Sequence, residues 1–175
     1  AEAQCFVTTP WSEDFSGNSW TTPFGITNSG SIPSCWSRVL TTGNYLWMAG
    51  PPAFVNANTG PDGDHTTGSG QYAYAESWFP LPTGGSNRDV THLVTPKIDL
   101  SSDTIPRVEF YYHLFGSQIS FLELRARKWG TTGWDLLQTF NPSSTTFSAN
   151  SSPWLKASVS LQSYAGDTIQ LRFTA

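Results

Sequence analysis

The chain has 175 residues, of which 38% are hydrophobic and 13% charged, with 15 glycines, 12 prolines and a formal net charge of −4 at pH 7. This length suits one domain with a single hydrophobic core, and the composition favours an all-β, loop-rich protein. The sequence contains no run of basic residues and no long apolar stretch. It therefore predicts neither nucleic-acid binding nor a membrane-spanning segment.

The first ten residues are predicted to be a lead-in, followed by a single domain at residues 11–175. The chain's 2 cysteines, Cys5 and Cys35, predict a disulfide that ties this lead-in to the domain. The bond would close a loop of about 30 residues and stabilise the fold by roughly 3 to 4 kcal/mol. It would also indicate an oxidising, extracellular compartment. The alternative is a pair of buried free thiols.

Strands are predicted wherever apolar and polar residues alternate between Gly, Pro, Asn and Ser. The candidate strands, in chain order, are Trp11–Phe15, Tyr72–Glu76, His92–Val94, Arg107–Phe115, Phe121–Arg127, Asp135–Phe140, Trp154–Val159 and Asp167–Phe173. A period of two buries Leu124 and Leu171 and leaves Arg125 and Arg172 outside. Many short strands without helical periodicity indicate an antiparallel β-sandwich.

The chain stops at Ala175, directly after the last predicted strand. From this position we expect a sandwich that lacks its last strand. One explanation is a trimmed chain. The other is an exposed edge that a partner strand fills, which predicts self-association through the C-terminal edge strand.

The most unusual loop is Thr59–Gly70, with the sequence TGPDGDHTTGSG. It places Asp62 and Asp64 in a glycine-rich turn, and Ca²⁺ prefers clustered carboxylate and carbonyl oxygens. A second acidic pair, Glu13 and Asp14, precedes an aromatic residue. The sequence therefore predicts a structural Ca²⁺ site formed by these four acidic residues, and the alternative is a plain turn.

No catalytic residue is predicted. The histidines at positions 65, 92 and 113 are far apart in sequence, without a zinc motif, and no serine occupies a nucleophile elbow. Paired carboxylates of a glycoside hydrolase are the remaining enzymatic alternative.

Aromatic residues are abundant, with 8 Trp, 11 Phe and 6 Tyr. Trp78, Trp129 and Trp134 lie in or beside predicted loops, where a flat ring can stack on a sugar or anchor a protein ligand. These three residues are the predicted ligand-binding residues. We expect Trp36 and Trp47 to plug the open ends of the sandwich instead.

One motif points to a family. The residues from Thr59 to Glu76 follow the pattern T-G-P-x-x-D-H-T-x-G-x-G-x-Y-x-Y-x-E. With the acidic Glu13–Phe15 segment, the Cys35–Trp36 pair and the Leu93–Ser101 segment, this pattern resembles the MAM domain. That family is an extracellular jelly-roll sandwich of adhesive receptors, surface proteases and secreted bacterial proteins, and the resemblance covers residues 11–175.

The resemblance implies a jelly-roll β-sandwich that acts as a non-catalytic binding or adhesion module of a secreted or cell-surface protein, with a structural Ca²⁺. Three departures from the family pattern are visible. Ser16 stands where the family commonly has Glu, and the family's last strand is absent beyond Ala175. The second cysteine pair of many animal members is also absent, which favours a bacterial-type member.

Three functions therefore remain open. The first is adhesion through a protein or glycan ligand at the cell surface or extracellular matrix. The second is a carbohydrate-binding module of a polysaccharide-degrading enzyme, and the third is a self-assembling surface protein completed by strand exchange.

Overall fold

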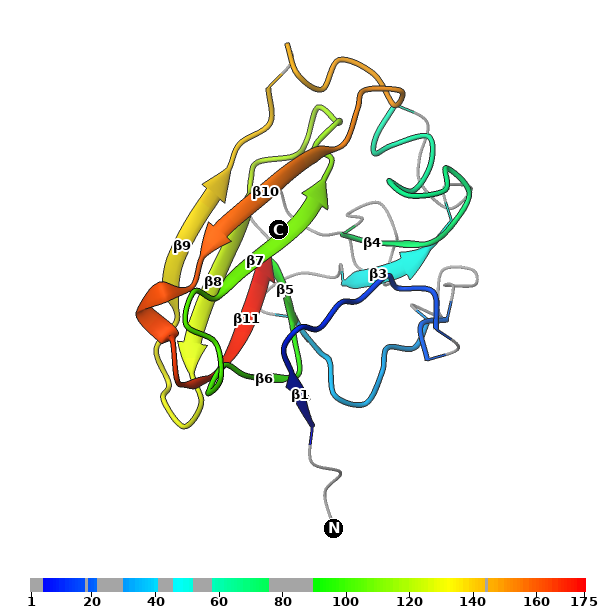
Figure 1. The fold of residues 1–175 in the computed structure, drawn as a ribbon. Helices are drawn as coiled ribbons and strands as arrows, with labels where there is room; N and C mark the ends of the chain where they lie inside the picture. The colour runs from blue at the N-terminus through cyan, green and yellow to red at the C-terminus, as the bar shows by residue number, and fades with distance from the viewer. Residues whose placement is uncertain are drawn as a thin grey trace.

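The computed structural model describes residues 5–17, 19–21, 30–40, 46–51, 58–75, 90–143 and 145–175. Apart from a short 3₁₀ turn at Gln162–Tyr164, the regular structure in these ranges is β (Figure 1). The strands are β1 (Phe6–Thr8), β2 (Ser37–Leu40), β3 (Trp47–Gly50), β4 (Tyr72–Ala75), β5 (Thr91–Val94), β6 (Lys97–Asp99), β7 (Arg107–Tyr112), β8 (Leu122–Lys128), β9 (Asp135–Phe140), β10 (Leu155–Ser160) and β11 (Thr168–Thr174). Within the described ranges, no helix is long and apolar enough to cross a membrane.

The larger sheet has seven strands and is organised around β11. On one side β11 pairs with β8 from Glu123 to Lys128, and β9 follows outside β8. On the other side β11 pairs with β6 near its start and with β5 near its end. Strand β1 runs parallel to β6, and β2 runs antiparallel to β5.

A break at Thr95 and Pro96 lets β5 and β6 share one edge of β11. The backbone amide of Thr95 donates to the carbonyl of Leu171 at 3.0 Å, and the Thr95 hydroxyl accepts from the amide of Leu171 at 3.0 Å. Thr95 is 2% exposed, so these bonds satisfy polar atoms that water cannot reach. β5 and β6 therefore both pair with the same side of β11, one on each side of the break.

The opposite layer contains two smaller sheets, β7 with β10 and β3 with β4. In Figure 1, β7 and β10 lie in front of β8, β11 and β5. The two layers bury apolar side chains between them, and the predicted all-β sandwich is confirmed.

The core follows the alternation in the sequence. Leu124, Ala126 and Ile169 are fully buried on the inner faces of β8 and β11. From the facing layer, the ring of Phe110 meets the ring of Phe140 edge-on, at a centroid distance of 5.5 Å. Edge-to-face aromatic pairs of this kind stabilise a core beyond simple area burial.

The Trp11–Phe15 strand prediction is wrong. Phe15 has a φ of 62°, which extended backbone excludes. The carboxylates of Glu13 and Asp14 instead accept hydrogen bonds from the amides of Phe15 and Ser16, which makes local turns. The pattern of alternation cannot reveal such turns.

The predicted disulfide between Cys5 and Cys35 is present. Just beyond Cys5, β1 lies within the predicted lead-in and extends the larger sheet through β6. The backbone amide of Lys97 donates to the carbonyl of Cys5 at 2.9 Å. The Cys5–Thr8 segment is therefore fastened both covalently and by backbone pairing.

The expected exposed C-terminal edge strand is also wrong for the described residues. β11 is paired on both sides, so its backbone offers no free edge to a partner strand. Any strand exchange would need a different strand.

Candidate functional site

The Thr59–Gly70 loop folds around the carboxylate of Asp64. Its Oδ2 accepts hydrogen bonds from the amides of Thr66 and Thr67, both at 2.9 Å. Its Oδ1 accepts from the Thr67 hydroxyl at 2.7 Å and from the amide of Gly70 at 2.6 Å. Burial raises the pKa of Asp64, but these hydrogen bonds outweigh burial and hold the pKa well below its usual range. The ionised carboxylate thus has a donor at each of its roughly four lone-pair positions.

Two glycines make this loop sterically possible. A Cβ added to Gly63 would collide with the backbone of Gly68. Gly68 itself has a φ of 75°, in the left-handed region that side chains disfavour. These two glycines therefore allow the backbone of the loop to cross over itself at close range.

The loop is docked on strand β7. The imidazole of His65 stacks on the ring of Tyr111, with centroids 3.4 Å apart and an interplanar angle of 17°. Beside it, the amide of Gly60 donates to the carbonyl of Phe115 at 2.7 Å. His65 therefore has a structural partner in the ring of Tyr111.

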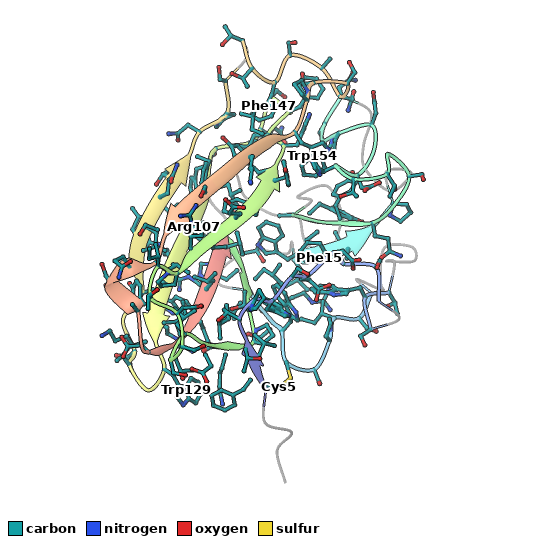
Figure 2. The ribbon with its side chains drawn as sticks, in the orientation of Figure 1. Cys5, Phe15, Arg107, Trp129, Phe147 and Trp154 are labelled. Carbon is teal, nitrogen blue, oxygen red and sulfur yellow. A yellow bond between two sulfur atoms is a disulfide. The ribbon has the colours of Figure 1, made fainter. Side chains whose placement is uncertain are left out.

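A second element that fixes the loop is the segment that precedes β10. The Nδ2 of Asn150 donates to the carbonyls of Thr59 at 3.0 Å and Gly60 at 2.8 Å. The Nε1 of Trp154 donates to the carbonyl of Gly63 at 3.0 Å. Figure 2 shows Trp154 and Phe147 at this end of the sandwich, opposite Cys5 and Trp129.

The other predicted metal ligands are occupied locally or exposed. Asp14 accepts from the Ser16 hydroxyl at 2.7 Å and from the Ser16 amide at 2.9 Å, and these bonds lower its pKa. Glu13 accepts from the Phe15 amide at 2.8 Å, and Asp62 is exposed.

These positions do not fit a shared Ca²⁺ site. Ca²⁺ takes about six to eight oxygen ligands, usually several of them carboxylates. In the part of the chain that the structure describes, no three His, Cys, Asp or Glu side chains gather in a group that could hold a metal. A cation at Asp64 would also have to displace at least one of the loop's own donors. The Ca²⁺ site predicted from the sequence stays an untested prediction, and the geometry of the described residues argues against it.

Trp129, a predicted ligand-binding residue, is 48% exposed on the hairpin between β8 and β9. The Nζ of Lys97 lies 3.7 Å from the centroid of its ring and 4.9 Å from that of Phe6. Phe6 is itself 41% exposed. The two exposed rings and the half-buried lysine form an aromatic and cationic cluster. Figure 2 shows Trp129 at the same end of the sandwich as Cys5.

Trp134, the second predicted ligand-binding residue, stacks with two arginines. The Cζ atoms of Arg127 and Arg172 lie 4.5 Å and 4.6 Å from the centroid of its ring. Trp78 lies outside the described residues. Trp36 and Trp47 are buried, at 7% and 8% exposure, which fits side chains that close the sandwich.

Arg127 and Arg172 belong to a larger group on the outer face of the seven-stranded sheet. Arg125 on β8 lies directly opposite Arg172 on β11. The Nη2 of Arg125 forms an ion pair with Oε2 of Glu123 at 2.8 Å, and the Nη2 of Arg127 donates to Oε1 of Gln170 at 2.8 Å. Burial first, and then the positive charge of Arg125, lower the pKa of Arg172.

The sequence placed these arginines on outward faces but did not identify them as a site. Their signal was the alternation in Phe121–Arg127 and Asp167–Phe173. That pattern does not reveal that the two strands are neighbours, or their register, and the register creates the cluster.

The two other histidines have structural partners. The Nδ1 of His92 lies 2.9 Å from the Thr174 hydroxyl. The Nε2 of His113 lies 3.1 Å from the carbonyl of Ser152, and its Nδ1 accepts from the amide of Phe115 at 3.4 Å. Burial lowers the pKa of both rings, which favours the neutral forms.

Comparison with known proteins gives a family match, a sequence relative and a structural neighbour. Residues 24–175 match the family model of the MAM domain, meprin/A5/mu. Neuropilin-1a of Danio rerio is 32% identical over 105 residues, which cover 60% of this chain and 10% of the relative. Among solved structures, the K1 cleaved adhesin domain of Lys-gingipain (Kgp) from Porphyromonas gingivalis W83 has a TM-score of 0.52 and 15% identity, with 81% of each chain covered. This structural likeness shows a shared sandwich fold.

Proposed function

The chain belongs to the MAM domain family, and from this premise we propose that it is an extracellular, non-catalytic adhesion module whose ligand is another protein. The observation that carries the proposal is the family match, which spans residues 24–175 and therefore most of the chain. MAM domains are binding modules that mediate protein interactions.

Two structural features support the proposal. The disulfide between Cys5 and Cys35 suits an oxidising compartment, where such bonds persist. The rigid sandwich also carries firmly docked surface elements, such as the loop around Asp64, and binding residues often lie on loops held by such a scaffold.

The test is adhesion of coated particles. Beads that carry the chain are mixed with one another and with cells of the organism that encodes it. Beads that carry an unrelated β-sandwich of similar charge are the control. We expect the chain to bind beads to cells, or beads to one another, above this control, and protease treatment of the cells to abolish the cell binding. Adhesion no greater than the control in both mixtures would contradict the proposal.

A second candidate function is glycan binding at Trp129. The observation that favours it is an exposed indole beside a second exposed ring, Phe6, because flat aromatic surfaces stack on the apolar faces of sugars. Pull-down with insoluble polysaccharides tests it. This function would be supported if Trp129→Ala removes the binding while Trp47→Phe, a substitution in the core, retains it. Absence of binding to every polysaccharide would exclude it.

A further inference from the structure

The outer face of the seven-stranded sheet contains an arrangement that a sheet built only for stability would avoid. Arg125 and Arg172 lie directly opposite each other on β8 and β11, and Arg127 follows two residues along β8. Like charges in directly opposite positions destabilise an antiparallel pair. Residues that break a local rule in this way are often found at functional sites.

The described surroundings neutralise only part of this charge. Glu123 pairs with Arg125 at 2.8 Å, and Gln170 bonds Arg127 without adding charge. Among the described residues, no carboxylate forms an ion pair with Arg127 or Arg172, and the Nε atoms of both are buried without a hydrogen-bond partner. Three guanidinium groups and one carboxylate leave an excess of two positive charges on a chain whose net charge is −4.

Trp134 orders two of these guanidinium groups before any ligand arrives. Both Cζ atoms lie within 4.6 Å of the centroid of the ring, at 4.5 Å for Arg127 and 4.6 Å for Arg172. Such cation–π contacts attract each guanidinium group to the face of the indole ring. Because the long side chains are already held, less rotamer entropy is lost on binding.

Apolar residues flank the arginines on the same face. Leu136 on β9 lies opposite Arg125 and is 50% exposed, and Val39 on β2 is 42% exposed. Arginine, an aromatic ring and exposed apolar residues together are typical of the central part of a protein interface.

We propose that this arginine face, defined by Arg125, Arg127, Arg172, Trp134 and Leu136, binds a protein partner that presents carboxylate side chains beside an apolar residue. Guanidinium groups bind carboxylates through two parallel hydrogen bonds, which suits this partner chemistry. The inference rests on the proposed function and names the surface that performs it. A uniformly charged polyanion fits less well, because the net negative charge of the chain repels it beyond the arginine face.

The experiment measures binding of the full chain by fluorescence anisotropy. The probe is a short labelled peptide in which glutamate alternates with threonine, so that an extended conformation presents its carboxylates on one side. The same peptide with glutamine in place of glutamate is the control probe, and a heparin oligosaccharide is the probe for sulfated glycans. We expect the glutamate peptide to bind about 10-fold more tightly than the glutamine peptide, with affinity that falls as salt rises.

The test variant is Arg172→Gln, because Arg172 has no ion pair that the substitution would break within the described structure. The matched control is Arg107→Gln, an exposed arginine on β7 in the opposite layer (Figure 2). We expect Arg172→Gln to weaken binding of the glutamate peptide about 10-fold and Arg107→Gln to leave its affinity unchanged. The melting temperature of Arg172→Gln should stay about equal, since the removed like-charge contact with Arg125 offsets the lost contact with Trp134.

Three results would overturn the inference. The first is equal binding of the glutamate and glutamine peptides, and the second is an equal effect of the two variants on peptide binding. The third is heparin that binds more tightly than the glutamate peptide and whose binding Arg172→Gln weakens by the same factor. A lowered melting temperature with unchanged peptide binding would assign Arg172 a structural role and likewise overturn it. If coated beads adhere and Arg172→Gln beads adhere equally, the surface is wrong while the proposed function stands. If wild-type beads do not adhere at all, the proposed function itself fails.

Discussion

The amide of Gly70 lies 2.6 Å from Oδ1 of Asp64, six residues earlier in the chain. This bond closes the loop on its own carboxylate, so that backbone and hydroxyl donors occupy the position where a cation was expected from the sequence. The loop that marks the family is therefore held by hydrogen bonds that the chain supplies.

Replacement of Asp64 should destabilise the protein. In Asp64→Asn the four donors lose a charged acceptor, and we expect the free energy of unfolding to fall by about 2 kcal/mol. Urea denaturation measures this change. Asp62→Asn is the matched control because Asp62 is exposed, and its effect should stay within about 0.5 kcal/mol.

The same denaturation curves test the calcium prediction. Because the donors around Asp64 are already paired with it, we expect the wild-type midpoint to be equal in excess Ca²⁺ and in excess EDTA. A midpoint that Ca²⁺ raises in the wild type but not in Asp64→Asn would establish a cation site at this loop and contradict the expectation.

Asn150 should be the main side-chain tie between the loop and the segment before β10. Asn150→Ala removes two hydrogen bonds to the carbonyls of Thr59 and Gly60, and we expect a loss of roughly 2 kcal/mol. Hydrogen exchange should show faster exchange of the loop amides, including that of Gly70. Ser151→Ala, at the exposed neighbouring position, should change neither quantity. Similar stability of the two variants would show that Asn150 is not the tie.

The contact between Tyr164 and Asp135 should give the stability a dependence on alkaline pH. The Tyr164 hydroxyl donates to Oδ2 of Asp135 at 2.7 Å, and burial first, then this bond, raise the pKa of Tyr164 to about 12. Because the folded pKa exceeds the unfolded value of about 10, the contribution is full below pH 10 and is lost as the pH rises through 12.

Tyr164→Phe tests this dependence. We expect the variant to lose about 1 kcal/mol at pH 7 and to show a shallower fall of stability above pH 10 than the wild type. Guanidinium denaturation at a series of pH values measures both effects. Parallel curves of stability against pH in the two proteins would contradict the assignment.

The disulfide should stabilise the described fold strongly. Cys5 and Cys35 are separated by 30 residues, and closure of such a loop contributes about 3 to 4 kcal/mol on the chain-entropy model. The Cys5→Ser/Cys35→Ser variant should therefore unfold at lower denaturant concentration, and reduction of the wild type should reproduce the shift. A titratable thiol in the unreduced native protein would show that the bond is not formed.

The strands with a clear buried face could be predicted from the sequence. Leu124 and Leu171 alternate with outward arginines, and both lie in the core as expected. Strands β1, β2, β3 and β6 were missed. Each has only three or four residues, and β3 is buried at all four of its positions, so these segments show no clear alternation. The backbone at Phe15 was predicted to be extended, but its φ of 62° comes from local side-chain hydrogen bonds that alternation does not encode.

The candidate sites, too, could be predicted only in part. The motif identified the loop around Asp64. The full set of hydrogen bonds to the Asp64 carboxylate depends on a close approach of the backbone at Gly63 and Gly68, which the sequence does not reveal. Outward arginines were visible in two separate segments. Their convergence depends on the register of β8 with β11, which sequence alternation leaves undetermined.

The most direct test of the account is adhesion of coated beads to cells, compared between the wild type, Arg172→Gln and Arg107→Gln. If the chain is a binding module that uses the arginine face, wild-type and Arg107→Gln beads will adhere equally, and Arg172→Gln beads will fall toward the level of the unrelated sandwich. Equal adhesion of all three coated beads would contradict the role of the arginine face, and adhesion of none, either to cells or to one another, would contradict the binding function.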